Sequence, residues 1–182
     1  MKTSWLDGFV LIVVVVSIGV ALVLLHSLCF PNGDEQSVTD AIVKLQPRYQ
    51  RVEAEELAGY FIEAANVNKE RPFDPLLLVS IAMRESSLLP EAVGQLGEIG
   101  LLQVHGVALR FLPSGCTIEE PRCQLLAGAG YLDYVREVCG GSTWKWVAAY
   151  GMSRCPSEEM ARNSHSVILA YRYYVSIGGL TW

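Results

Sequence analysis

Apolar residues run without interruption near the start of the chain, and further along they recur at helical spacing. Residues 9–30 contain no Asp, Glu, Lys or Arg. A helix needs about 20 apolar residues to cross the hydrocarbon core of a bilayer, and Trp5 stands just before the run, where an interfacial aromatic residue belongs. The pattern predicts an uncleaved transmembrane helix at 9–30, preceded by a short cytoplasmic segment at 1–8.

A cleaved signal peptide is the alternative interpretation of this run. Signal peptides have an apolar region of about 7–15 residues followed by a cleavage site of small residues. Here the run is longer, no Ala-x-Ala follows it, and Leu28 precedes Cys29 where a lipoprotein signal would have a small residue. Lys2 weakly favours a cytoplasmic N-terminus. We therefore expect a single-pass protein of the inner (cytoplasmic) membrane with its domain in the periplasm.

The remainder of the chain divides into an expected linker at 31–50, with a short helical stretch that ends at Pro47, and an expected domain at 51–182. Alternating strand patterns are nearly absent from the domain, whereas apolar residues recur at three- and four-residue spacing. We expect helices from about residue 52, at about 75–87, 120–138, 142–151 and 157–176, and a glycine-rich loop at 94–100. The predicted fold class is mainly α.

The amino-acid composition excludes two classes of protein, disordered chains and nucleic-acid-binding domains. The chain has 182 residues, of which 51% are hydrophobic and 18% are charged, with a net charge of −5. Such a composition excludes a disordered chain, because disorder requires low hydrophobicity and high charge. A nucleic-acid-binding domain needs a basic face, so we expect no nucleic-acid partner.

Four cysteines lie in the expected domain: Cys116, Cys123, Cys139 and Cys155. In a small non-cytoplasmic domain they indicate two disulfides, for which three pairings exist. Short sequence separation favours Cys116–Cys123 and Cys139–Cys155. The chain contains no Cys-x-x-Cys, and no histidine stands at ligand spacing from the cysteines. We therefore expect no metal site and no cofactor.

Glu85 stands on the apolar face of a predicted helix. Asp74 and Pro75 form a strong helix start, and Leu78 and Ile81 fall on the same face as Glu85. Glu85 also lies in the last turn, where the helix dipole disfavours an anion, and burial acts in the same direction. We expect both effects to raise its pKa above about 4.3, as general-acid cleavage of a glycosidic bond requires. A structural ion pair with an arginine, Arg84 or Arg110, is the alternative.

The segment that follows carries a family resemblance. Residues 85–103 read Glu-Ser-Ser-Leu-Leu-Pro-Glu-Ala-Val-Gly-Gln-Leu-Gly-Glu-Ile-Gly-Leu-Leu-Gln. This resembles the signature of soluble-lytic-transglycosylase-like domains, where Glu-Ser, a Pro and Ala-Val precede Gly-x-Gly-Leu-Met-Gln. Residues 127–132, 148–150 and 168–171 are similar to the family's Ala-Gly-x-x-Tyr-Leu helix, its Ala-Ala-Tyr-Asn and its closing helix. The resemblance covers about 55–175 in order, and such a match is specific.

The resemblance implies a lysozyme-like α fold and a membrane-anchored lytic transglycosylase acting on peptidoglycan glycan strands. Glu85 would be the acid/base in cleavage of the MurNAc–GlcNAc bond, leaving 1,6-anhydromuramyl ends. The residues implied for substrate binding are Gln103, Tyr150, Ser86, Leu102 and His105. Three alternatives stay open: Tyr150 as a core residue, Gln103 as a brace of the loop, and His105 as an ordinary loop residue.

The chain departs from the family at Gly94, where a Ser is frequent, and at Gly151, where an Asn is common. We expect each glycine to remove a hydrogen bond to the sugar. A hydrolytic muramidase resembling goose-type lysozyme is a second hypothesis, with Glu98 as the second carboxylate; an inactive peptidoglycan-binding assembly subunit is a third. The anchor and disulfides resemble specialised members that serve a secretion system, a pilus or a phage, so a phage virion membrane is an alternative location.

Overall fold

The computed structural model describes residues 35–180, and this part of the chain is mainly helical. It contains no named strand, only isolated bridges that join Ile99 to Val93 and to Val104. The helices in chain order are α2 (Glu35–Leu45), α3 (Arg51–Ala65), α4 (Pro75–Ser86), the 3₁₀ helix η1 (Gly106–Phe111), α5 (Pro121–Cys139), α6 (Thr143–Met152), α7 (Glu158–Arg162) and α8 (His165–Ser176).

The predicted membrane anchor at 9–30 lies outside the described residues. Among the helices that are described, none is both long and apolar enough to cross a bilayer.

Helix α4 begins where the sequence predicts. The Asp74 carboxylate caps it by accepting a hydrogen bond from the Leu76 amide at 2.9 Å, and Pro75 occupies the first turn. Ser87 ends the helix in the left-handed conformation, with φ of 57°. Every residue from Pro75 to Ala82 is buried, so the helix is held in the core and presents its C-terminal turn, with Glu85, at a fixed place.

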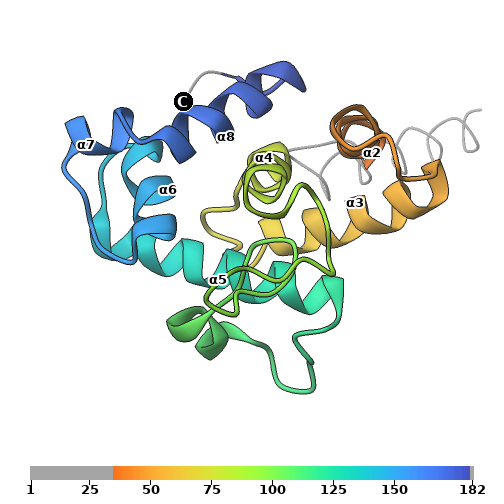
Figure 1. Ribbon diagram of the computed structural model, residues 1–182, viewed down its shortest axis with the longest axis horizontal. Helices are drawn as coiled ribbons and strands as arrows, with labels where there is room; N and C mark the ends of the chain where they lie inside the picture. The colour runs from red at the N-terminus through yellow and green to blue at the C-terminus, as the bar shows by residue number, and fades with distance from the viewer. Residues whose placement is uncertain (1–34, 181–182) are drawn as a thin grey trace, which may run out of the picture. The chain divides into compact units, whose positions relative to one another are not determined.

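Helix α5 is the longest described helix and organises the packing around it. It packs against α3, α6 and η1, whereas α4 packs against α2, α3 and α8 (Figure 1). Phe61, Leu78 and Leu132, from three different helices, are among the largest fully buried side chains. The apolar stripes predicted from the sequence therefore meet in one core.

Two segments differ in detail from the sequence-based expectation. The stretch expected as a linker contains α2, which buries Val38 and Ile42 and packs on α3, so the packed helices include the chain from Glu35. The single helix expected at 157–176 is two helices, because the chain leaves the helical conformation at Ser164, whose ψ is 122°.

Both favoured disulfides are present. Cys116 is bonded to Cys123 with a Cα–Cα distance of 5.6 Å, and Cys139 to Cys155 with 5.3 Å. The first closes the connection between η1 and α5. The second ties the end of α5 to the segment that follows α6. The short-range pairing predicted from the sequence is confirmed.

Candidate functional site: a cleft at the end of helix α4

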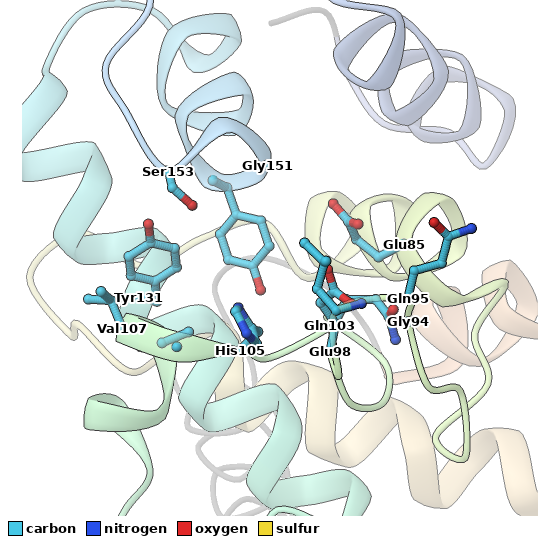
Figure 2. A pocket seen from close by; sticks show the side chains of 14 residues that line it. Glu85, Gly94, Gln95, Glu98, Gln103, His105, Val107, Tyr131, Gly151 and Ser153 are labelled. Carbon is cyan, nitrogen blue, oxygen red and sulfur yellow. The ribbon is translucent and has the colours of Figure 1, made fainter.

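A cleft of about 660 Å³ opens beside the last turn of α4. Figure 2 shows Glu85 on α4 at one end of this cleft and Tyr131 at the other, with Gly151 and Ser153 along one side and Gln103 and His105 between them. The lining residues are Glu85, Gly94, Gln95, Leu96, Glu98, Gln103, His105, Gly106, Val107, Ala108, Tyr131, Tyr150, Gly151 and Ser153. The structure thus gathers parts of α4, the glycine-rich loop, η1, α5 and α6.

Glu85 lines the cleft and forms an ion pair with Arg84. The Glu85 side chain is 14% exposed, so it is largely removed from solvent yet open to the cleft. Of the two arginines considered from the sequence, Arg84 is the partner, while Arg110 lies exposed on η1. The ion pair and the cleft position coexist, so the pairing does not remove Glu85 from the site.

Gln103 braces the loop and also lines the cleft. Its Nε2 donates to the Gly100 carbonyl at 3.0 Å and to the Ala92 carbonyl at 3.4 Å. Its backbone adopts φ of 48°, which a residue with a Cβ rarely does. Such strain costs on the order of 1–3 kcal/mol and persists where surrounding contacts enforce it, often at functional sites. Gln103 therefore braces the loop and also lies in the cleft wall, and its contact with a sugar stays a prediction.

Tyr150 reaches the floor of the cleft from α6. Its hydroxyl donates to the Leu102 carbonyl at 2.6 Å, and its ring centroid lies 5.4 Å from that of Tyr131. Burial, with a smaller contribution from Tyr131, strongly raises the pKa of the Tyr150 phenol, so the hydroxyl stays protonated as a donor. Tyr150 is thus both a core residue and a lining residue.

Two residues predicted to bind substrate lie beneath the cleft and not in its lining. The Ser86 hydroxyl is buried, at 2.9 Å from the Leu101 carbonyl and 3.0 Å from the Ala82 carbonyl. Leu102 is 1% exposed. Their side chains connect the loop to α4 and fill the floor, so they support the site from below.

Glu98 and His105 also line the cleft. The amides of Glu98 itself and of Leu96 donate to the Glu98 carboxylate, the latter at 2.8 Å, and hold the pKa of that carboxyl below its ordinary value. His105 adds to this effect through its charge. Glu98 is therefore ionised near neutral pH, and His105 is exposed in the loop.

Three residues on α5 that shape or support the cleft were not identified from the sequence: Gln124, Gly128 and Tyr131. Gln124 is 1% exposed; its Oε1 accepts from the Leu101 amide at 3.0 Å and its Nε2 donates to the Pro90 carbonyl at 2.9 Å. Gln124, Gly128 and Tyr131 recur at i, i+4 and i+7 on one buried face. The sequence did carry one sign of this role: Gln124 stands among apolar residues on the buried face of α5, and a buried amide requires polar partners.

Gly128 lets the loop approach α5 closely. A Cβ there would lie 2.7 Å from the Leu102 Cβ and 3.0 Å from the Tyr150 hydroxyl oxygen. The floor of the cleft can therefore form in this way only because residue 128 is a glycine.

Within residues 35–180, no group of three His, Cys, Asp or Glu side chains is placed to hold a metal ion. The polar groups of the cleft are carboxylates, amides, an imidazole and phenols, which suit a sugar substrate through hydrogen bonds.

A family model described as the transglycosylase SLT domain matches residues 60–167. The matched range is more than half of the chain and contains every residue that lines the cleft. No curated protein matched the chain, and no solved structure matched it.

Proposed function

Because the chain belongs to the transglycosylase SLT domain family, we propose that it is a lytic transglycosylase that cuts the MurNAc–GlcNAc β-1,4 bond of peptidoglycan. Membership of the family supports a lysozyme-like domain and a peptidoglycan substrate. The observation that carries the finer proposal is the placement of Glu85, a carboxylic acid 14% exposed in the wall of the cleft.

Glu85 would act alone as acid and base. In its protonated form it donates to the bridging oxygen, and the glycosidic bond breaks through an oxocarbenium-like state. The resulting carboxylate then accepts the proton of the muramyl C6 hydroxyl while that oxygen bonds to C1. This hydroxyl is tethered to the reacting sugar, so its effective concentration is high and it outcompetes water. The product is a 1,6-anhydro ring, and no water is consumed.

The neighbouring side chains would hold the sugar for this step. The Gln103 amide oxygen and the exposed imidazole of His105 both lie in the lining. The Tyr150 hydroxyl is engaged by the Leu102 carbonyl, so it contributes its ring and the position of the loop. Aromatic rings and amides of this kind orient a pyranose through stacking and hydrogen bonds.

A hydrolytic muramidase is the second candidate, favoured by one observation. Glu98 lines the same cleft, and its lowered pKa keeps it ionised as a base that activates water requires. Against this, one Glu98 oxygen already accepts the Leu96 amide, which reduces its ability to take a proton from water. An inactive peptidoglycan-binding assembly subunit is the remaining alternative.

The location is part of the proposal. An anchor at 9–30 would place the domain in the periplasm, beside the inner membrane, with peptidoglycan within reach. The two disulfides support an oxidising compartment, since structural disulfides are rare in the cytosol. A secretion system, a pilus or a phage particle would be the apparatus served.

Mass spectrometry of muropeptides released from purified peptidoglycan tests the reaction. We expect products one water lighter than their hydrolysed counterparts, and loss of general acid–base catalysis in Glu85→Gln of about 10²–10⁴-fold or more. Glu98→Gln is the matched control: it should leave the anhydro products at normal yield. Ordinary reducing ends that disappear in Glu98→Gln would establish the muramidase, and no release by the wild-type protein would favour the assembly subunit.

A further inference from the structure

Arg84 lies against the proposed acid in the last turn of α4. Its guanidinium pairs with the Glu85 carboxylate. Within residues 35–180, Glu85 is the one hydrogen-bond partner of this guanidinium, although the group has five N–H donors. The Arg84 side chain is only 25% exposed, and burial lowers its pKa. A guanidinium so placed remains charged. Its charge acts on the Glu85 carboxylate beside it and also on the Tyr150 phenol, where burial raises the pKa and the Arg84 charge partly offsets that rise.

The guanidinium lies next to Gly151 of α6. A Cβ on Gly151 would be 3.6 Å from Nη1 and 3.9 Å from Nη2 of Arg84, which is ordinary van der Waals contact. The guanidinium therefore packs on the bare backbone of α6 on one side and on the Glu85 carboxylate on the other. Its planar fork is confined by these two contacts, so the carboxylate is confined with it.

The charge of Arg84 has a defined consequence for a general acid. A cation within about 4–6 Å of a carboxyl favours the carboxylate form. General-acid catalysis requires the protonated form, so the cation limits activity to lower pH. The same fork fixes the direction in which the carboxyl oxygens point, and reactivity depends on such orientation.

Resting on the function proposed above, we propose that Arg84 is a positioning residue that orients the Glu85 carboxyl across the cleft and sets the upper pH limit of catalysis. The other titratable groups that face the cleft are Glu98 and His105 from the loop and Tyr131 and Tyr150 from α5 and α6. Helices α2, α3 and α8, which pack against α4, contribute no lining residue. Of these titratable groups, His105 is the one that ordinarily changes charge between pH 5 and 8.

The pH profile of kcat/KM tests the proposal, because its alkaline limb reports the acid in the free enzyme. Arg84→Met keeps the apolar stem and removes the charge, so the limb should move up by about 1 pH unit or more, with a lower plateau from lost orientation. Arg84→Lys keeps the charge without the fork, so the limb should stay in place while the plateau falls. Arg110→Met is the matched control, with an unchanged limb.

A His105→Gln background separates the histidine from the acid. If the shift in Arg84→Met persists there, the titrating group is Glu85; if it vanishes, the limb belonged to His105 and the proposal is overturned. A limb in Arg84→Met within about 0.3 pH unit of the wild type also overturns it.

A second measurement needs no substrate. The side-chain carboxyl carbon of Glu85, assigned by its loss in Glu85→Gln, can be titrated by NMR in the full chain. We expect its midpoint to rise in Arg84→Met and to stay unchanged in Arg110→Met. If the wild-type protein releases no muropeptides, the proposed function fails while this titration still tests Arg84. An unchanged midpoint would refute the role of Arg84 whatever the reaction is.

Discussion

Replacing Gln124 by Leu should detach the glycine-rich loop from α5. The Gln124 amide accepts from the Leu101 amide at 3.0 Å and donates to the Pro90 carbonyl at 2.9 Å, and the side chain is 1% exposed. Leucine has a similar size but no polar atoms, so both backbone groups would be left without their partner. Leu101 itself is fully buried, so water cannot readily replace the lost hydrogen bond.

The magnitude follows from these two groups. A buried donor or acceptor left unsatisfied costs about 1–3 kcal/mol, which gives about 2–6 kcal/mol for the pair. Burial of the leucine side chain returns part of this, since burying a leucine is worth about 1.5–3 kcal/mol. We therefore expect the free energy of unfolding of Gln124→Leu to fall by about 1–3 kcal/mol.

Urea unfolding of the full chain, followed by far-UV circular dichroism, measures this change. The free energy of unfolding falls with urea at a slope of about 1–3 kcal/mol per molar. With the same slope in both proteins, the expected loss of stability should lower the midpoint of unfolding by about 0.5–1.5 M. Gln46→Leu is the matched control, because Gln46 makes one exposed hydrogen bond to the Ser87 carbonyl; its loss should cost less than about 1 kcal/mol. If the two variants lose equal stability, the argument that Gln124 holds the loop is refuted.

Two further predictions concern the floor of the cleft and the second disulfide. Gly128→Ala would place a Cβ 3.0 Å from the Tyr150 hydroxyl oxygen; we expect a loss of about 1–3 kcal/mol in unfolding free energy and reduced muropeptide release. Gly59→Ala, where a Cβ would meet nothing within 4 Å, is the helical control and should be neutral or stabilising. Cys139→Ser breaks the bond to Cys155, which spans 16 residues; the urea midpoint should indicate a loss of about 3 kcal/mol, and an unchanged midpoint would contradict this.

The sequence predicted best where a local signal decides the structure. Asp74 and Pro75 mark the start of α4 through capping and ring geometry, and the helical period then places Glu85 without knowledge of the rest of the fold. The two disulfides likewise follow from short separations along the chain. These features need few tertiary contacts, so they were available to reasoning from the sequence.

Features fixed by tertiary contacts were missed. The break between α7 and α8 falls at Ser164, a residue type that favours N-caps, but it stands in the polar stretch 162–166, which is also compatible with the exposed face of one continuous helix. Helix α2 resembles a short amphipathic piece of a linker until α3 and α4 are there to cover Val38 and Ile42. The role of Gln124 depends on its hydrogen bonds to the backbone of Leu101 and Pro90, which are far from it along the chain. The sequence around Gln124 does not indicate these partners.

Gly94 and Gly151, the two glycines that depart from the family pattern, also have surroundings that only tertiary contacts determine. From the sequence, each was expected to remove a hydrogen-bonding side chain from the site. In the structure, a Cβ on Gly94 would lie 2.6 Å from the Gln103 Oε1 and closer still to the Glu98 carboxylate. A Cβ on Gly151 would lie 3.6 Å from the Arg84 guanidinium. At Gly94 the place is thus occupied by polar groups that reach in from elsewhere in the chain, so this glycine makes room for them, whereas a Cβ on Gly151 would only touch the guanidinium. A serine restored at position 94 would have to displace Glu98 or Gln103, and it should therefore lower activity instead of raising it.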